Sequence, residues 1–351
     1  MFVVKSSVRA GIINVTGYIG AEIARLLHQH PQVELKSVTG RSSAGQDLGK
    51  VFPHLENTGL VIKPDIDEDI DIAFSAMPHK TSLDVVSQLL GKGIKVIDVS
   101  ADFRLKDASE YPNWYGFKHP TPELLKSAVY GLPEIHRGDI AGASLIANPG
   151  CYSTSIILAL APIVKAGLIK PEIIIDSKSG VSGAGRTPSM TTNYSEVNEN
   201  ISAYSLGGHR HLPEVQQELG FLNTNTPLSI TFVPHLVPIT RGILSSCYAK
   251  LKNDISLGDD ELNDKIRRIY TDFYKDAPFV KIVGEPPKTK HVWGSNLCLI
   301  YITVDRRTGT LIVICCIDNL VKGGAGQAVQ NMNLMFNFPE TAGLEALSIY
   351  P

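Results

Sequence analysis

The sequence predicts an α/β protein with a mostly parallel-sheet domain followed by a β-rich domain. The first half alternates short apolar runs with segments of helical spacing, which is typical of βαβ units. The second half is dominated by strand-like runs, and the chain of 351 residues is long enough for two domains at about 100–200 residues each. We place the boundary near Asn148, so that residues 1–147 form the first domain and residues 148–317 form the second.

The elements of the first domain follow from apolar spacing and helix stops. The first helix ends at His30 because Pro31 cannot continue it. The expected strands are residues 8–14, 33–39, 73–77, 95–99 and 144–147, and the expected helices are 19–30 and 80–90.

The second domain is expected to hold a mixed or antiparallel sheet, entered through an apolar helix at 156–164. A turn at Arg306–Gly309 has the character of a hairpin. The expected strands are residues 172–176, 229–233, 243–251, 296–304 and 310–317, followed by a helix at 320–336.

Composition excludes several classes of protein. The net charge is −2, with 43% hydrophobic and 19% charged residues, which indicates a folded chain with no general field for nucleic acid or anionic lipid. The longest uncharged stretch, residues 140–164, is broken by Pro149 and Pro162 and does not read as a membrane span. Residues 1–10 do not resemble a signal peptide, so a cytosolic location is expected.

The five cysteines divide into four structural residues and one candidate nucleophile. An odd number without paired C-x-x-C spacing disfavours both a disulfide framework and a zinc site, and no metal is indicated. Cys247, Cys298, Cys315 and Cys316 lie in strand-like apolar runs and are expected to be buried.

The segment Asn14-Val-Thr16-Gly17-Tyr18-Ile-Gly20 follows a strand and opens a helix, as a dinucleotide-binding fingerprint requires. Asn14 stands where the first glycine is expected, and asparagine tolerates the left-handed backbone better than most residues. Alone, the motif is equally compatible with a structural βα turn.

The end of the second strand favours NADP over NAD. Arg41, Ser42 and Ser43 stand where an NAD site usually has an acidic residue, and an arginine accommodates a 2′-phosphate. The alternative is a solvated loop arginine.

Cys151 follows the turn Asn148-Pro-Gly150 and leads into the apolar helix. A helix N-terminus stabilises a thiolate and can hold a developing oxyanion, so Cys151 is a candidate nucleophile. The alternative is a buried cysteine at a strand end. Its candidate partners are His209 and His211, with Glu214 as the residue that could orient an imidazole.

Two further segments are rich in anion-binding groups. Residues 176–186 combine three serines and three glycines with Lys178 and Arg186, and Arg104 follows the end of a parallel strand. Either segment could be only a flexible loop.

These motifs together resemble the N-acetyl-gamma-glutamyl-phosphate reductase family. The matching segments are Val99–Leu105, Tyr130–Glu134, Asn148–Thr154, Asp176–Arg186, Gly207–Glu214, Pro234–Gly242 and Asp318–Ala328, in the family's order and over nearly the whole chain. Asn14 is the departure, because the family usually has glycine there.

The resemblance implies a Rossmann domain that binds NADP (NADPH) and an α+β catalytic domain of the glyceraldehyde-3-phosphate and aspartate-semialdehyde dehydrogenase type. It implies reduction of N-acetyl-L-glutamyl 5-phosphate to the 5-semialdehyde and phosphate, in arginine biosynthesis, through a thioester on Cys151. It also implies that residues 318–351 pack back on the first domain. A homo-oligomer, dimer or tetramer, is expected by analogy.

The resemblance also implies roles for particular residues. His211 is favoured over His209 as the acid and base. Candidates for the cofactor are Thr16, Gly17, Tyr18, Gly20, Arg41, Ser42, Ser43, Asn319, Lys322 and Gly323. Candidates for the substrate's phosphate are Arg104, Ser179, Gly180, Ser182 and Gly183, and for its α-carboxylate Arg186, Arg210 or Arg241.

Three other functions compete with this interpretation. A sister reductase of a carrier-protein-linked 2-aminoadipyl 6-phosphate, in lysine biosynthesis, would share these motifs. A cysteine acyltransferase or hydrolase would leave Gly17, Gly20 and Arg41 unexplained. A non-catalytic NADP sensor would leave Cys151 and the histidine motif without a role.

Overall fold

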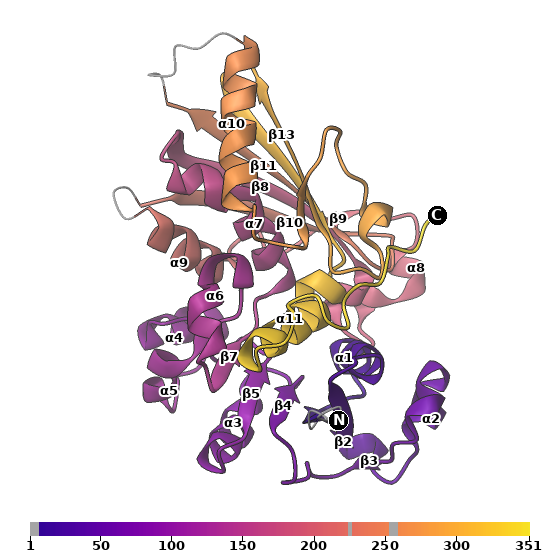
Figure 1. Ribbon diagram of the computed structural model, residues 1–351. Helices are drawn as coiled ribbons and strands as arrows, with labels where there is room; N and C mark the ends of the chain where they lie inside the picture. Colours follow the sequence, from indigo (N-terminus) through magenta and orange to yellow (C-terminus); the bar gives the residue numbers. More distant parts are fainter. Residues whose placement is uncertain (1–6, 224–226, 253–258) are drawn as a thin grey trace, which may run out of the picture. The chain divides into compact units, whose positions relative to one another are not determined.

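The computed structural model describes residues 7–223, 227–252 and 259–351. The chain divides into two compact units (Figure 1). Unit 1 comprises residues 1–149 and 324–346, and unit 2 comprises residues 150–323 and 347–351.

Unit 1 is built on a seven-stranded sheet in the order β3-β2-β1-β4-β5-β7-β6. Every strand pair in it is parallel, which confirms the parallel sheet predicted from the alternation of elements. The order reverses between β1 and β4, where open α/β sheets bind their ligands. The strands are β1 Val8–Ile13, β2 Val33–Thr39, β3 Ile62–Lys63, β4 Ile72–Ser75, β5 Lys95–Asp98, β6 Val129–Tyr130 and β7 Leu145–Ala147.

The helices of unit 1 include one from the far end of the chain. Helix α11 packs against α1 and α6 although nearly 200 residues separate it from α6. The helices are α1 Tyr18–His28, α2 Leu48–Val51, α3 Ser82–Gly91, α4 Tyr111–Tyr115, α5 Pro122–Ser127, α6 Pro133–Ala141 and α11 Gly326–Met335.

Unit 2 contains a mixed sheet in the order β12-β13-β14-β11-β8-β10-β9. The neighbours β8 and β10 are parallel, whereas β11, β13 and β14 form antiparallel pairs, as the sequence predicts. The expected hairpin at residues 306–309 is confirmed by the pairing of Asp305 with Thr310. The strands are β8 Ile169–Gly180, β9 Ser202–Ala203, β10 Ser229–Val237, β11 Ile243–Leu251, β12 Val280–Ile282, β13 Cys298–Asp305 and β14 Thr310–Ile317.

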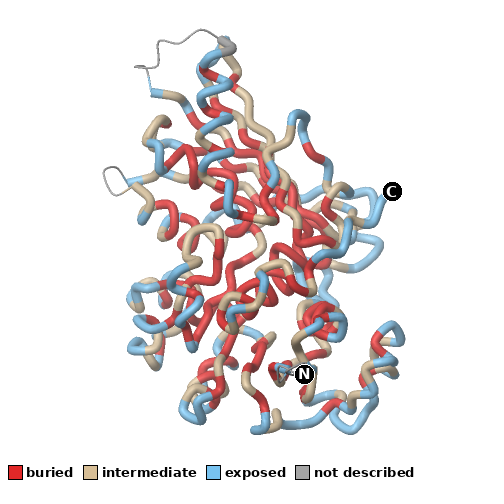
Figure 2. The backbone as a smooth tube through the Cα atoms, viewed as in Figure 1, coloured by how far each residue is buried: buried red, intermediate tan, exposed pale blue. Residues whose placement is uncertain are grey.

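One face of this sheet is covered by helix α7, Cys151–Lys165, which also contacts α9, Leu212–Leu222, and α10, Asp259–Phe273. A short α8 spans Tyr194–Val197. Thirteen of the fifteen residues of α7 are buried, and the central strands of both units are buried in the same way (Figure 2). Strand β8 alternates between its faces, because Ile173 and Ile175 are buried while Ile174 is 53% exposed.

Helix α7 is fixed by hydrogen bonds that compensate for an internal proline. Pro162 has no N–H, so it leaves the carbonyl of Leu158 without its helical donor. The buried hydroxyl of Tyr274 donates to that carbonyl at 2.6 Å, and Tyr270 donates to the next carbonyl, that of Ala159, at 2.7 Å. These bonds hold the helix whose first residue is Cys151.

The four cysteines expected in the core are buried, and Cys151 is the partly exposed one among the five. No helix among the described residues is long and apolar enough to cross a membrane.

Candidate active site

The predicted nucleophile lies where the sequence places it, at the first residue of α7. The helix is capped by Gly150, which has extended backbone and no side chain to cover the N-terminal N–H groups. Free N–H groups at a helix N-terminus favour negative charge on a thiol and on a substrate oxygen. Cys151 is half-buried, whereas the other four cysteines are buried.

Two glycines allow other segments to approach Cys151 closely. A side-chain carbon on Gly323 would lie 2.8 Å from the Cβ atom of Cys151. A side-chain carbon on Gly150 would lie 2.6 Å from Nε2 of His211, so the imidazole of His211 rests against the turn that precedes the nucleophile. Neither position tolerates a larger residue without displacing a group of the site.

The two histidines of the motif have different environments. The backbone N–H of His211 donates to Nδ1 of His209 at 3.1 Å, and the two rings lie 4.8 Å apart. Burial, and then the charge of Arg210, lower the pKa of His209 to about 4, so this ring is neutral at physiological pH. His209 therefore supports His211 as an uncharged hydrogen-bond acceptor.

Glu214 is fully buried at the first turn of α9. One of its carboxylate oxygens accepts a hydrogen bond from the N–H of Gly150 at 3.0 Å. Sequence reasoning assigned Glu214 to an imidazole and did not predict this bond to the helix cap. The bond fixes the turn before Cys151.

The serine- and glycine-rich segment leaves the end of β8 as a tight turn, residues Val181–Ala184. Ser179 and Ser182 are buried, and Ser182 donates to the carbonyl of Thr240 at 2.6 Å. A side-chain carbon on Gly180 would lie 2.7 Å from the same carbonyl oxygen. The segment is therefore packed against residues 240–242, whereas its last residue, Arg186, is exposed.

The predicted substrate arginines differ in their surroundings. Arg210 is exposed, as Arg186 is. Arg241 is half-buried, and its guanidinium lies 3.6 Å from the fully buried carboxylate of Asp318. Arg104, in unit 1, is buried and donates to the carbonyls of Asn148 and Val99. These bonds anchor Arg104 at the strand ends, and its contact with the substrate's phosphate stays a prediction.

The residues expected near the nicotinamide are buried in unit 2. The side-chain oxygen of Asn319 accepts from the N–H of Gly242 at 2.7 Å, and its amide donates to Ser182 at 2.9 Å. Lys322 is fully buried, with its ammonium 5.8 Å from the centre of the Phe279 ring. Asn319 thus joins the two loops that carry the predicted substrate residues.

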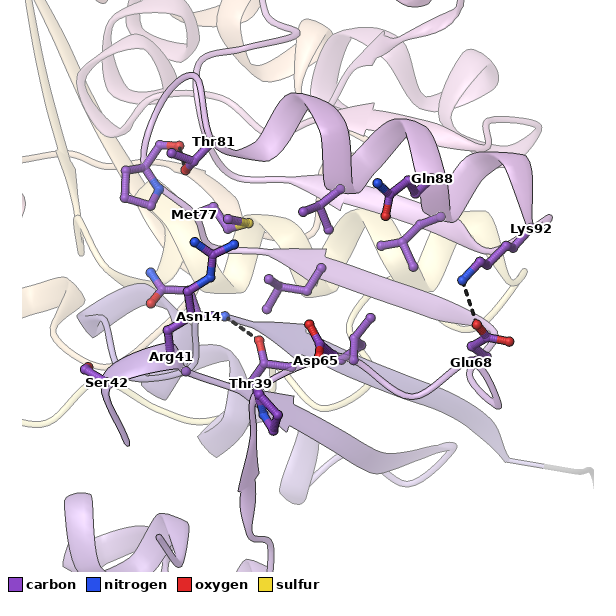
Figure 3. A pocket seen from close by; sticks show the side chains of 17 residues that line it. Asn14, Thr39, Arg41, Ser42, Asp65, Glu68, Met77, Thr81, Gln88 and Lys92 are labelled. Atoms are coloured by element: carbon purple, nitrogen blue, oxygen red, sulfur yellow. Dashed lines mark hydrogen bonds and ion pairs between the residues drawn. The ribbon is translucent and has the colours of Figure 1, made fainter. Parts of the chain in front are cut away.

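Unit 1 contains a pocket of about 580 Å³ at the carboxyl ends of β1, β2 and β4 (Figure 3). Asn14, Thr39, Arg41 and Ser42 form one side of it (Figure 3). Sequence reasoning missed much of the remaining lining, which comes from the segment between β3 and β4, from the residues after β4 and from α3. These residues are Pro64, Asp65, Ile66, Glu68, Met77, Pro78, Thr81, Val85, Gln88, Leu89 and Lys92.

Asn14 explains how the fingerprint survives without its first glycine. Its φ is +64°, the left-handed conformation that the missing glycine would adopt. Its side-chain amide donates to the carbonyl of Ala76 at 2.8 Å, which links the ends of β1 and β4. Gly20 is required for close packing, because a side-chain carbon there would lie 2.6 Å from the carbonyl oxygen of Asn14.

The pocket fits a dinucleotide with a 2′-phosphate. Its apolar wall can accept a planar base, and Arg41 supplies a fixed positive charge at the end of β2. Thr16, Gly17, Tyr18 and Gly20 form the neighbouring turn and the start of α1. Ser43 is in the same short helical turn as Arg41 but is not part of the pocket lining.

Comparisons with known proteins define the class of this fold and site. Residues 9–143 match the family model of the semialdehyde dehydrogenase NAD binding domain, and residues 151–319 match that of the semialdehyde dehydrogenase dimerisation domain. The fold is similar to aspartate semialdehyde dehydrogenase II from Vibrio cholerae, with a TM-score of 0.69 at 16% identity over 95% of this chain and 99% of that one. It is similar to the aspartate semialdehyde dehydrogenase with NADP from Candida albicans, with a TM-score of 0.70 at 15% identity over 94% and 99%. The protein is therefore of the semialdehyde dehydrogenase class.

Relatives with higher identity narrow the class. The chain is 55% identical over 343 residues to the N-acetyl-gamma-glutamyl-phosphate reductase of Dehalococcoides mccartyi, covering 98% of this chain and 99% of that protein. It is 49% identical over 353 residues to the reductase of the same name from Citrifermentans bemidjiense, covering 98% and 100%. The chain belongs to the N-acetyl-gamma-glutamyl-phosphate reductase family.

Proposed function

We propose that this protein catalyses the NADPH-dependent reduction of N-acetyl-L-glutamyl 5-phosphate to N-acetyl-L-glutamate 5-semialdehyde and phosphate, in arginine biosynthesis. The observation that carries the proposal is the placement of Cys151 at the start of α7 with His211 against its N-cap, in a chain that belongs to this reductase family. The relatives' names favour the glutamyl substrate over the carrier-linked aminoadipyl one.

We assign the two chemical tasks to the two units. Unit 1 binds NADP through the pocket beside Arg41 and Ser42 and through the turn from Thr16 to Gly20. Unit 2 carries the nucleophile and the substrate-binding loops. The match of residues 9–143 to an NAD binding domain supports the first assignment.

The reaction begins with the thiolate of Cys151. It attacks the acyl carbon, the bond from carbon to the phosphate oxygen breaks, and a thioester forms as phosphate leaves. The N–H groups at the start of α7 stabilise the negative charge on the substrate oxygen in this step. The hydrogen bond from the N–H of Gly150 to the carboxylate of Glu214 holds those groups in place.

Bound NADPH supplies a hydride to the thioester carbon. His211 donates a proton to the oxygen, giving a hemithioacetal, and takes it back as the carbon–sulfur bond breaks and the aldehyde leaves. The thiolate of Cys151 is thereby regenerated. His209 is unsuited to this exchange because its low pKa keeps it neutral.

Arg241 is the best candidate for the substrate's α-carboxylate. It is half-buried and attached to the loop that packs on residues 180–182, whereas Arg186 and Arg210 are exposed. Arginine pairs with carboxylate through two parallel hydrogen bonds. We assign the serine–glycine turn at residues 179–183 to binding of the substrate's phosphate.

We also propose that the protein is a homodimer or larger homo-oligomer that associates through the open face of the unit 2 sheet. That face bears a row of partly exposed apolar side chains on adjacent strands, Ile174, Tyr248 and Ile312. The match to a dimerisation domain over residues 151–319 supports this choice of surface. A Tyr248→Glu variant should therefore have a lower mass in light scattering than the parent. The cytosolic location stays a prediction from the sequence.

The direct test is the reverse reaction, which avoids the labile acyl phosphate. We expect the protein to reduce NADP⁺ only when both N-acetyl-L-glutamate 5-semialdehyde and inorganic phosphate are present. A rate without phosphate would contradict the acyl-phosphate step. If the protein binds NADPH but shows no activity in this assay, the carrier-linked substrate or a non-catalytic dinucleotide-binding role would be favoured instead.

A further inference from the structure

We propose that Trp293 is a positioning residue that orients Arg241 toward the substrate's carboxylate, and that the last residues of the chain hold Trp293 in place. The proposal rests on the proposed function, because it takes Arg241 as the carboxylate ligand. Trp293 lies outside every motif that identified the site, and its contacts with Arg241 and with the last residues of the chain are all within unit 2.

Trp293 contacts Arg241 directly. The indole N–H donates to the backbone carbonyl of Arg241 at 2.8 Å. Gly242, the following residue, has a φ of +109°, and a side-chain carbon there would lie 3.4 Å from Nε1 of Trp293 and 2.8 Å from Cβ of Thr289. The turn after Arg241 is therefore shaped to accept the loop that carries Trp293.

The peptide groups on both sides of Arg241 are also bonded. The carbonyl of Thr240 accepts from the hydroxyl of Ser182 at 2.6 Å, and the N–H of Gly242 donates to Asn319 at 2.7 Å. With the bond from Trp293, three consecutive residues are fixed by three different segments. Because the backbone is held in this way, the guanidinium of Arg241 can move only by rotation about the side-chain bonds.

Asp318 connects the same loop to the side chain of Arg241 and to the nucleophile. One carboxylate oxygen accepts from the N–H of Gly294 at 2.8 Å and lies 3.6 Å from the guanidinium. The other oxygen accepts from the N–H of Leu320 at 2.8 Å, at the start of the segment that brings Gly323 against Cys151. A shift of the Trp293 loop would therefore move the guanidinium relative to the sulfur.

The chain terminus braces this loop. The N–H of Ile349 donates to the carbonyl of Trp293 at 2.8 Å. Ser348 bonds to the hydroxyl of Ser295 at 2.9 Å and donates to the carbonyl of His291 at 2.8 Å. The terminal residues thus hold the loop on both sides of Trp293.

Orientation matters because a guanidinium binds carboxylate through two bonds in one plane. A small rotation of the Arg241 backbone would weaken both bonds to the substrate's carboxylate. It would leave phosphate and NADP binding unchanged, since neither is assigned to Arg241. The expected signature of losing Trp293 is therefore selective for one substrate.

The test compares Trp293→Phe with Trp293→His in the reverse reaction. Phenylalanine keeps the apolar contact and removes the donor, whereas the five-membered ring of histidine can place Nε2 where the indole places Nε1. We expect Trp293→Phe to raise the KM for the semialdehyde about fivefold, the effect of one neutral hydrogen bond. The KM for NADP⁺ and phosphate should stay the same, and Trp293→His should recover most of the loss.

The other tryptophan provides the control. Trp114 donates one indole hydrogen bond to Glu110 in unit 1, so Trp114→Phe removes the same kind of bond elsewhere. In that variant Trp293 is the remaining tryptophan, because the chain has two. We expect its emission to change when the semialdehyde is added without NADP⁺ and not to change when Arg241→Gln is also present.

The outcomes separate this proposal from the proposed function. Normal wild-type activity with an unchanged semialdehyde KM in Trp293→Phe would overturn the role of Trp293 alone. Equal increases in all three KM values, or no recovery in Trp293→His, would show that Trp293 is merely structural. Absence of the phosphate-dependent reaction in the wild-type protein would instead overturn the proposed function.

Discussion

Helices α1 and α7 both begin after a strand, and each has as its N-cap a glycine, which has no side chain to cap the helix. Their surroundings differ. The turn before α1 lies beside a pocket of about 580 Å³, and its residues are small or make backbone bonds. The start of α7 is Cys151 itself, and His211, Glu214 and Gly323 lie around it. The same helix geometry therefore serves binding where space is left for a ligand and chemistry where reactive groups fill the space.

Removing the nucleophile should have the largest effect, because it abolishes the chemistry at α7 and leaves the binding site at α1 intact. Cys151→Ala should lower turnover by roughly 10⁴-fold or more, because no other group replaces a covalent nucleophile. NADPH binding, measured by fluorescence titration, should be nearly unchanged. Cys298→Ala is the matched control, since that thiol is buried in the sheet and takes no part in the reaction. Full activity of Cys151→Ala would end the thioester mechanism.

The next largest effect tests the division of labour between the histidines. His211→Asn should lower kcat by about 10²–10⁴-fold, the usual contribution of a general acid–base. His209→Asn should cost much less, because an amide can still accept the hydrogen bond from the His211 N–H. Equal losses of kcat in the two variants would argue against the assignment of His211.

The low pKa of His209 also gives a stability test with a defined sign. Between about pH 6.5 and about pH 4 the unfolded chain binds a proton that the folded protein does not, so acidification favours unfolding in this window. Melting temperatures of the wild type should therefore fall more steeply than those of His209→Asn over this range. Parallel curves would contradict the buried, neutral state of His209.

The cofactor pocket is tested by its charge. Arg41→Ala should raise the KM for NADPH about 10- to 100-fold, since bonds to charged groups are stronger than neutral ones. The KM for NADH, which lacks the 2′-phosphate, should hardly change. Lys92→Ala is a suitable control, because this lysine lines the same pocket but is paired with Glu68. Equal effects on the two cofactors would reject the 2′-phosphate role of Arg41.

The smallest effect concerns the turn before α1. Asn14→Gly should be nearly neutral for stability, because glycine adopts the left-handed backbone but loses the bond to Ala76. Asn14→Ala should lower the free energy of unfolding by about 1–3 kcal/mol, through left-handed strain and the lost bond. Denaturant midpoints of the two variants provide the measurement, and identical midpoints would show that the left-handed backbone imposes no constraint.

Much of this architecture could be predicted from the sequence because local patterns carry it. Apolar runs and helix stops located the main strands and α1, and the turn chemistry located Cys151 at the start of α7. What could not be predicted depends on contacts between distant segments. Three features have no signal in the local sequence. They are the hydrogen bond from the Gly150 N–H to Glu214, the part of the cofactor pocket that comes from α3 and the segment before β4, and the position of Trp293 beside Arg241.

Arg104 and Asn319 show the limit of motif reasoning most directly. Both have the residue type that suits a ligand, and both belong to segments that resemble the family. Arg104 bonds to two strand-end carbonyls, and Asn319 bonds to Gly242 and Ser182. A motif marks a residue as important without distinguishing contact with the substrate from support of the residues that make contact.

The proline inside α7 constrains how this helix can vary over evolution. Pro162 leaves the Leu158 carbonyl to the hydroxyl of Tyr274, so the proline depends on a tyrosine 112 positions away. Replacing the tyrosine alone would leave the carbonyl without a donor. Replacing the proline alone would restore the helical donor, and a carbonyl oxygen can accept both bonds. The tyrosine should therefore be lost only after the proline, and a helix breaker can persist in the helix that presents the nucleophile as long as the tyrosine remains.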